Sequence, residues 1–113
     1  MNGNLFPRRG EIYWVDLDPA KGRETQKTRP GLVLSCNIAN QHSDLIMIAP
    51  ITSKLKIIYP FEVQTILDEK PAKIMLNQCR AVDKVRLLRK MGKIGSNIMD
   101  QVEDAIRIVF GLT

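Results

Sequence analysis

Short apolar runs of strand length recur along this chain, and only one stretch, near the C-terminal end, has the spacing of a long helix. Strands are predicted over residues 12–17, 31–37, 45–49, 60–66, 72–82 and 89–94. The run over 45–49 is continuously apolar and therefore predicts a central strand. Many short strands followed by one helix predict a mainly β (α+β) protein, a small antiparallel barrel or curled sheet with a helix attached.

The C-terminal helix is the clearest single element. Gly95-Ser96 provides a break and an N-cap, and Gly111 suits the C-terminal end. One apolar stripe at helical spacing is formed by Ile98, Val102, Ala105, Ile106 and Val109. Glu103 and Arg107 are expected to pair on the outer side of the helix. The stripe should therefore pack on the sheet.

Shorter signals lie between the strands. Residues 38–43 are a weak helical signal, and residues 68–71 predict a turn. Asp83 can cap a short helical turn that ends at Leu88. Trp14, the only tryptophan, is expected in the core rather than as a base-stacking platform.

Length and composition indicate a folded protein without membrane spans. At 113 residues, the chain is expected to form one domain over residues 1–113. Its hydrophobic content of 44% excludes disorder by composition, and no apolar run approaches the roughly 18 residues of a membrane span. Cys36 and Cys79 form no ligand pattern, so two free thiols in a cytoplasmic protein are expected.

The formal net charge of +5 indicates an anionic partner. The partner could be nucleic acid or an acidic peptide, and because the cations are spread along the chain, the charge alone favours nucleic acid over a merely well-solvated surface only modestly.

The polar loop over residues 22–30 joins two predicted core strands, a common place for binding and catalytic groups. Pro30 keeps Arg29 extended, because the proline ring clashes with a helical residue before it. Arg29 therefore lies at a stiff point where the loop meets the core. On pattern alone, it could equally anchor the loop through an ion pair with Glu24.

The sequence lacks the common motifs that bind metals or cofactors. The chain has a single histidine, His42, in a polar segment where solvent exposure is expected, and its carboxylates are too scattered to suggest a divalent metal site. No phosphate-binding glycine loop or hydrolase motif occurs. An enzyme with this sequence is expected to work without metal or cofactor.

Five motifs together resemble the MazF/PemK-type toxins of type II toxin–antitoxin systems. In order along the chain they are Gly10–Pro19 with Lys21, Gly22 and Glu24, then Thr28-Arg29-Pro30, Pro50–Ser53, Tyr59–Val63 and Gln78–Asp83. Their order and spacing match the family over nearly the whole chain.

The resemblance implies an SH3-like barrel that acts as a homodimer in the cytoplasm. It also implies a sequence-selective, metal-independent endoribonuclease, an mRNA interferase acting on single-stranded RNA. Cleavage would use the ribose 2′-hydroxyl and leave a 2′,3′-cyclic phosphate and a 5′-hydroxyl. A cognate antitoxin, for which the positive charge predicts an acidic and partly apolar inhibitory segment, would block the site.

The resemblance also assigns residues. Arg29 matches the family's catalytic arginine and Thr52 its catalytic threonine, while Glu24 and Gln78 match positions that hold or read RNA. The chemistry of the reaction makes Glu24 a further candidate for the catalytic set. RNA contacts are expected from Gln26, Lys27, Ser53, Lys54, Lys56, Asn77, Gln78 and Arg80. Asn77 departs from the family, because some relatives carry a catalytic aspartate there.

The identity of the general base stays open at this stage. Arginine is a poor base because its pKa lies above about 12, so Glu24 is the physically simpler choice. Two other functions also remain: a toxin of the same fold that binds a protein such as DNA gyrase, and a plain RNA-binding module. The constellation of Arg29 with Thr52 favours the ribonuclease, since a gyrase-binding surface would not require it.

Overall fold

A computed structural model describes residues 5–17 and 28–112 of the chain. The strands are β1 (Glu11–Asp16), β2 (Thr28–Val33), β3 (Leu45–Thr52), β4 (Glu62–Leu67), β5 (Lys70–Met75), β6 (Arg80–Asp83) and β7 (Leu87–Lys93). The helices are α1 (Asn37–His42) and α2 (Ser96–Phe110), and the short 3₁₀ turns are η1 (Leu76–Gln78) and η2 (Lys84–Arg86).

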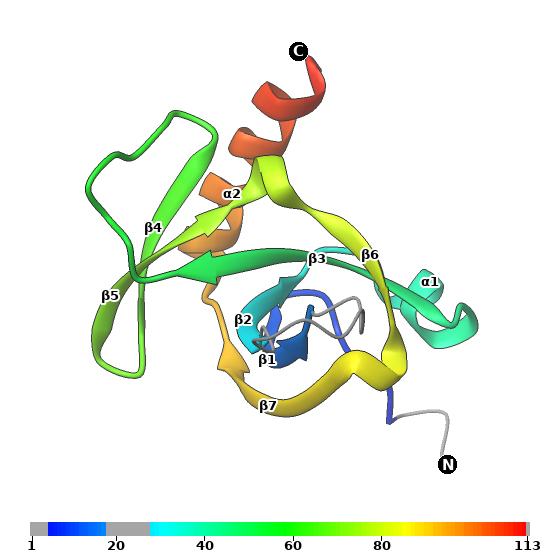
Figure 1. Ribbon diagram of the computed structural model, residues 1–113. Helices are drawn as coiled ribbons and strands as arrows, with labels where there is room; N and C mark the ends of the chain where they lie inside the picture. The colour runs from blue at the N-terminus through cyan, green and yellow to red at the C-terminus, as the bar shows by residue number, and fades with distance from the viewer. Residues whose placement is uncertain (1–4, 18–27, 113) are drawn as a thin grey trace.

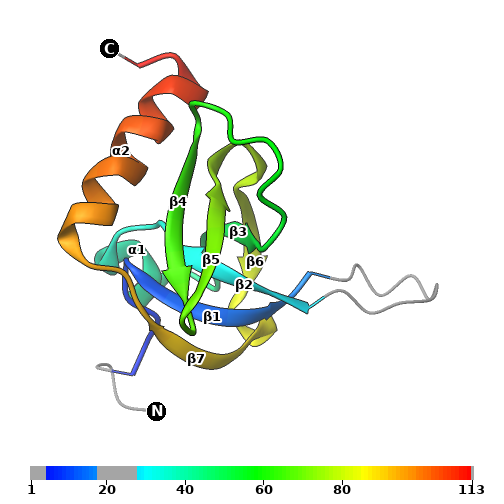
Figure 2. The same ribbon diagram turned by 90° about the vertical axis from the view of Figure 1, so that its left-hand side faces the viewer.

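The seven strands form one curled antiparallel sheet in the order β4-β5-β3-β2-β1-β7, with β6 paired to β3 (Figure 1). Strand β3 is central, because it pairs with β6 along its first half, with β2 in the middle and with β5 at its end. Helix α2 lies beside β4 on one side of the sheet (Figure 2). The predicted mainly β class, a curled antiparallel sheet with a C-terminal helix, is confirmed.

Two apolar clusters fill the two sides of the sheet. Successive side chains of a strand point to opposite faces, so Ile46 and Ile48 of β3 enter one cluster and Ala49 and Ile51 the other. The cluster that contains Ile51 continues into α2, whereas the cluster that contains Ile48 fills the inside of the curl. Strand β3 is therefore buried on both sides, as its continuous apolar run predicts.

Helix α2 packs with the predicted stripe but not with every predicted contact. Val102 and Ala105 are buried, and the other stripe residues pack around them. Gly111 ends the helix in the left-handed conformation, with φ of 69°.

Three details of the helix differ from the prediction. The N-cap is Gly95, which leaves the first turn without a side-chain cap. Arg107 binds Asp104 at 3.0 Å rather than Glu103. Glu103 instead binds Arg9 at 3.0 Å, because the N-terminal arm lies within reach of α2.

The long strand predicted over residues 72–82 is wrong, because the chain breaks into β5, η1 and β6. Thr52 pairs with Lys73 whereas Ile48 pairs with Arg80, so the two pairings differ in register by three residues. The turn η1 takes up those three residues. A local insertion of this kind bends a sheet, much as a bulge does.

Other boundaries shift by a few residues. Strand β2 begins at Thr28 and ends at Val33, earlier than predicted at both ends, and β7 begins at Leu87. Asp83 caps η2 as predicted, accepting a hydrogen bond of 3.0 Å from the Val85 N–H. Trp14 is only half-buried, so its assignment to the core is corrected.

Helix α1 confirms the weak helical signal, and His42 is exposed as expected. Both cysteines are free. Among the described residues, no helix is long and apolar enough to cross a membrane.

Candidate functional site

The site forms where β3 leaves β2 and joins β5. The last pair between β2 and β3 at this end is Gly31 with Pro50, and β3 then pairs with β5 at Ile51 and Thr52. Pro50 and its neighbour across the fork, Pro30, cannot donate a ladder hydrogen bond, which suits the place where two strands separate.

Arg29 and Thr52 lie on the two sides of this fork. Extending the register of Gly31 and Pro50 by two residues sets Arg29 across from Thr52. Arg29 itself pairs with Val15 of β1, so it has the extended backbone that Pro30 predicts. Two residues far apart in the sequence are thus held by neighbouring strands rather than by loops.

Gly31 leaves room for the side chains of the two neighbouring strands to pack over it beside the fork. A Cβ atom on this residue would lie 2.9 Å from Cγ2 of the buried Val15 and 3.4 Å from Cδ1 of Ile48. Any larger side chain would therefore displace the buried side chains of Val15 and Ile48 next to Arg29.

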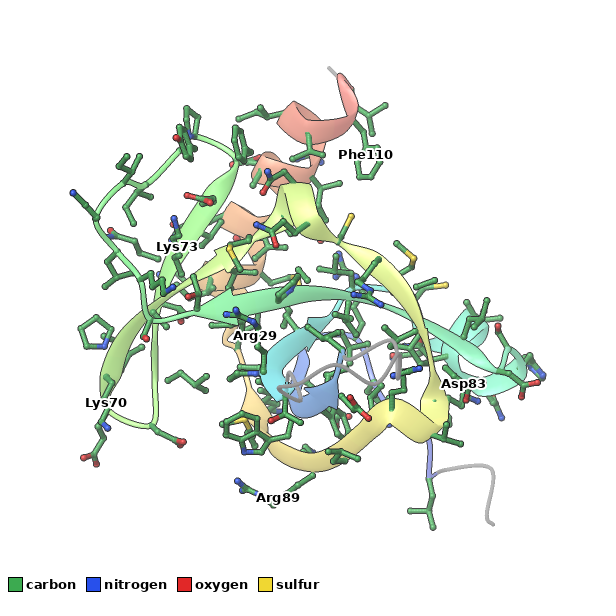
Figure 3. The ribbon with its side chains drawn as sticks, in the orientation of Figure 1. Arg29, Lys70, Lys73, Asp83, Arg89 and Phe110 are labelled. Atoms are coloured by element: carbon green, nitrogen blue, oxygen red, sulfur yellow. The ribbon has the colours of Figure 1, made fainter. Side chains whose placement is uncertain are left out.

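A cleft of about 450 Å³, called here the central cleft, opens over the fork. Its lining combines strand ends with the turn η1 and the segment between β3 and β4: Leu17, Arg29, Pro50, Thr52, Lys54, Tyr59, Glu62, Lys73, Met75, Asn77, Gln78 and Arg80. Figure 3 shows Arg29 against β3 near the middle of the molecule and Lys73 on the neighbouring β5.

The central cleft gathers most of the residues that the sequence singled out. They are Arg29, Thr52, Lys54, Asn77, Gln78 and Arg80. Ser53 instead lines a second cleft of about 380 Å³, which adjoins the first at Arg29, Thr52 and Lys54 and includes Trp14. Lys56 is exposed and lines neither cleft. Glu24, Gln26 and Lys27 lie outside the described residues.

Gln78 and Arg80 reach the central cleft by different routes. The sequence predicted both within one long strand over residues 72–82, but Gln78 belongs to η1 and Arg80 begins β6. Arg80 pairs with Ile48, and Gln78 donates a hydrogen bond to Sδ of Met75 at 3.5 Å. The turn η1 therefore places two amide side chains, Asn77 and Gln78, in the lining of the cleft.

The central cleft has an excess of positive charge. It contains four cationic residues and one carboxylate, Glu62, which is bound to Lys73. Within residues 5–17 and 28–112, no carboxylate forms an ion pair with Arg29, Lys54 or Arg80. These three cations are therefore available to an anion that enters the cleft.

Thr52 is almost fully buried, with 9% of its surface exposed. Its Oγ1 accepts a hydrogen bond of 3.2 Å from the Lys54 N–H. A hydroxyl group can accept and donate at once, and no acceptor for its own hydrogen is found in the described part of the chain. Thr52 can thus donate to an oxygen atom placed in the cleft.

The sequence analysis missed the buried ion pair at the floor of the cleft. Lys73 Nζ lies 2.9 Å from Oε1 of Glu62 and also donates to the Ile57 carbonyl at 2.7 Å. The two charged side chains are only 10% and 5% exposed. The sequence did contain a signal, because Lys73 is the one charged residue within the otherwise apolar run 72–76, and an ammonium group buried in such a run needs a partner.

Metal ligands do not gather here. Among the residues that the structure describes, no three His, Cys, Asp or Glu side chains lie close enough together to hold a metal ion. The polar groups of the cleft are hydrogen-bond donors in the main, and donors do not bind cations.

Fold and cleft together define a class of small basic proteins in which a curled antiparallel β-sheet with one C-terminal helix forms a cationic cleft over a strand fork. The model of the family described as PemK-like, MazF-like toxin of type II toxin–antitoxin system matches residues 8–110. The chain therefore belongs to the PemK-like, MazF-like toxin family.

Relatives and solved structures agree with this assignment. Endoribonuclease MazF9 of Mycobacterium tuberculosis is 34% identical over 110 residues, which cover 89% of this chain and 93% of the relative. Endoribonuclease EndoA of Bacillus subtilis is 34% identical over 113 residues, covering 96% and 97%. The crystal structure of MazF from Deinococcus radiodurans matches with a TM-score of 0.79 at 27% identity, covering 96% of this chain and 99% of that one.

The same fold occurs in one chain of a solved MazE–MazF structure. One chain of a MazE–MazF structure from Deinococcus radiodurans matches with a TM-score of 0.79 at 26% identity, covering 95% of this chain and 98% of that one.

Proposed function

We propose that this chain is a metal-independent endoribonuclease toxin that cuts single-stranded RNA through the ribose 2′-hydroxyl. The products would be a 2′,3′-cyclic phosphate and a 5′-hydroxyl. One observation carries the proposal: Arg29 and Thr52 flank a strand fork beneath a cleft that contains two further cations without carboxylate partners, Lys54 and Arg80. The family and the names of its relatives, endoribonucleases MazF9 and EndoA, support the endoribonuclease activity and the role as a toxin.

The charges of the cleft suit a phosphodiester. Attack by the 2′-hydroxyl places negative charge on the phosphoryl oxygens, and a fixed guanidinium stabilises such charge through paired hydrogen bonds. Arg29 is held by its pairing with Val15 and by the ring of Pro30, so little reorganisation would be needed. Thr52 would add a neutral donor to the same oxygens.

The proton of the 2′-hydroxyl needs an acceptor. Glu62, the carboxylate in the central cleft, is a poor candidate, because its Oε1 already accepts from Lys73 and from the Tyr59 N–H at 2.9 Å each. The guanidinium group of Arg29 offers hydrogen-bond donors and no acceptor. We therefore retain Glu24 as the proposed general base, and Gln26 and Lys27 as RNA contacts from the same loop.

Cognate antitoxin binding and dimer formation complete the proposal. The same cations would attract an acidic, partly apolar segment of the antitoxin, and the adjoining second cleft offers the apolar walls of Trp14, Leu67 and Met91. A solved MazE–MazF complex of this fold supports a protein inhibitor. We also propose that the chain forms a homodimer, because its resemblance to the family implies one.

The test is cleavage of a short RNA with a single 2′-deoxy substitution on the 5′ side of the scissile phosphate. Mapping the new 5′ ends on a long RNA first identifies the cut site. The natural RNA should be cut with or without EDTA, and the deoxy RNA should remain intact. Activity lost in EDTA would contradict metal independence, and normal cutting of the deoxy RNA would contradict the 2′-hydroxyl mechanism.

A matched experiment tests the inhibitor. The toxin's affinity for its antitoxin should fall as the salt concentration rises, because pairing across an exposed surface is screened. An antitoxin that binds equally well at all salt concentrations, or that leaves RNA cleavage unaffected, would contradict the shared site.

A further inference from the structure

An exposed aromatic ring lines the central cleft and has no role in the proposed chemistry. Tyr59 belongs to the segment between β3 and β4, and 47% of its surface is exposed. It lines the central cleft together with Arg29, Lys54 and Arg80. An aromatic ring beside unpaired cations is the combination that binds a nucleobase and its phosphate together.

A second ring supports Tyr59 from one side. The rings of Tyr59 and Phe61 stack with centroids 5.3 Å apart and an interplanar angle of 6°. Phe61 is itself half-buried, so it anchors the pair to the protein. A ring stacked on one face offers its other face to a further flat group.

The backbone around Tyr59 is fixed by the buried ion pair. Oε1 of Glu62 accepts the Tyr59 N–H at 2.9 Å and the Lys73 ammonium at 2.9 Å. Lys73 also binds the carbonyl of Ile57, two residues before Tyr59, at 2.7 Å. Two of these hydrogen bonds hold the segment at the rim of the cleft, near the labelled Lys73 in Figure 3, and the third joins the two side chains that make them. A platform fixed in this way loses little conformational entropy on binding.

We infer that Tyr59 is a base-stacking platform that holds one nucleotide of single-stranded RNA in the central cleft. The inference deepens the proposed ribonuclease function and rests on it. Trp14 is the other aromatic candidate, but it lines the second cleft and not the central one. Tyr59 shares its cleft with Asn77 and Gln78, whose amides can reach the edge of a stacked base.

The experiment uses the full chain and an RNA that spans the mapped cut site and carries the protective 2′-deoxy substitution there. The fluorescent base 2-aminopurine replaces each nucleotide in turn, and stacking on an aromatic ring quenches it. Wild-type protein should quench one position strongly. Tyr59→Leu should remove that quench and weaken RNA binding about 5- to 150-fold, the range measured for loss of one stacked base.

Two further variants separate stacking from other effects. Tyr59→Phe keeps the ring and should retain both the quench and the affinity. Leu88→Ala removes an exposed apolar side chain outside the cleft, 58% exposed, and should change neither. Circular dichroism confirms that each variant is folded.

The outcomes distinguish this inference from the function on which it rests. If wild-type protein cuts RNA but Tyr59→Leu binds within twofold of wild type, the stacking platform is overturned and the ribonuclease stands. Weaker binding with an unchanged quench would also overturn it, because Tyr59 would then be a rim contact without a stacked base. Wild-type protein that neither binds nor cuts RNA would overturn both proposals.

Discussion

The two ends of strand β1 differ in whether the charged side chains beside them have ion-pair partners. At the first end, Glu11 binds Lys90 at 2.8 Å and accepts hydrogen bonds from the Arg8 N–H and the Tyr13 hydroxyl. At the other end, Val15 pairs with Arg29, and the neighbouring Asp16 is engaged by Arg86. Arg29 therefore has no carboxylate partner among the described residues although an acid lies close in the fold.

The charge of Glu11 is neutralised within the fold, whereas that of Arg29 is the one proposed to bind RNA. Burial tends to raise the pKa of Glu11, but hydrogen bonds from Lys90, Arg8 and Tyr13 outweigh it, and its pKa falls below the ordinary value. Burial, together with the negative charge of Glu11, raises the pKa of Tyr13 to about 12. The groups at this end satisfy one another. At the other end, Arg86 is paired with Asp16, but Arg29 has no ion-pair partner among the described residues.

The largest expected effect is on cleavage. Arg29→Ala should lower kcat about 10²- to 10³-fold, the usual loss when one fixed donor to a developing charge is removed. Lys90→Ala is the matched control, since it removes a cation from the Glu11 end and should leave kcat unchanged. Cleavage rates on a single-site RNA measure both.

Thr52→Ala should also reduce cleavage strongly, but it will not be neutral for stability. Thr52 is buried and its hydroxyl accepts the Lys54 N–H, so the variant should lose about 1 kcal/mol of unfolding free energy. Thr52→Ser keeps the hydroxyl and should recover much of the activity. An inactive Thr52→Ser with wild-type thermal stability would argue that the methyl group, not the hydroxyl, matters.

The next effect compares a buried ion pair with an exposed one. Lys73→Met leaves Glu62 charged and poorly paired at the cleft floor, and should lower the unfolding free energy by about 2–3 kcal/mol. Lys90→Met breaks a pair in which the lysine side chain is 51% exposed, and should cost about 1 kcal/mol or less. Denaturant unfolding measures both, and equal losses would show that burial does not set the strength of these two ion pairs.

A smaller effect is expected in the salt dependence of RNA binding. Contacts from Arg29, Lys54 and Arg80 predict a slope of log affinity against log salt of about −2, at about 0.7 per phosphate contact on a single strand. Lys54→Ala should reduce the slope by about 0.7, and Lys90→Ala should leave it unchanged. A change in slope from Lys90→Ala would extend the RNA surface to the Glu11 end.

The smallest effect concerns pH. Because the pKa of Glu11 is lowered on folding, its ion pair stabilises the protein above the ordinary pKa of 4.5, and this stability is lost as the pH falls through the folded pKa. Glu11→Gln should therefore cost about 0.5–1 kcal/mol at pH 7 and progressively less below pH 4.5. Urea unfolding at several pH values follows the difference, and a constant difference would show that packing, not charge, is responsible.

Local patterns in the sequence determined the elements. The apolar run of β3 predicted a strand buried on both sides, and the stripe from Ile98 to Val109 predicted the packed face of α2. The ring of Pro30 predicted the extended backbone of Arg29. These signals could be read because each depends on neighbours within one or two helical turns or within one strand.

Only the tertiary structure decided how those elements meet. The three-residue shift of register between β5 and β6 depends on both pairing with the same strand β3, and no local pattern within residues 72–82 records that. Likewise Glu103 binds Arg9 rather than Arg107, because a partner from the distant N-terminal arm is nearer than the one on its own helix. The ion pair of Glu62 with Lys73 and the position of Tyr59 depend on the same kind of contact. Charge pairing depends on distance in space, and the sequence gives distance only along the chain.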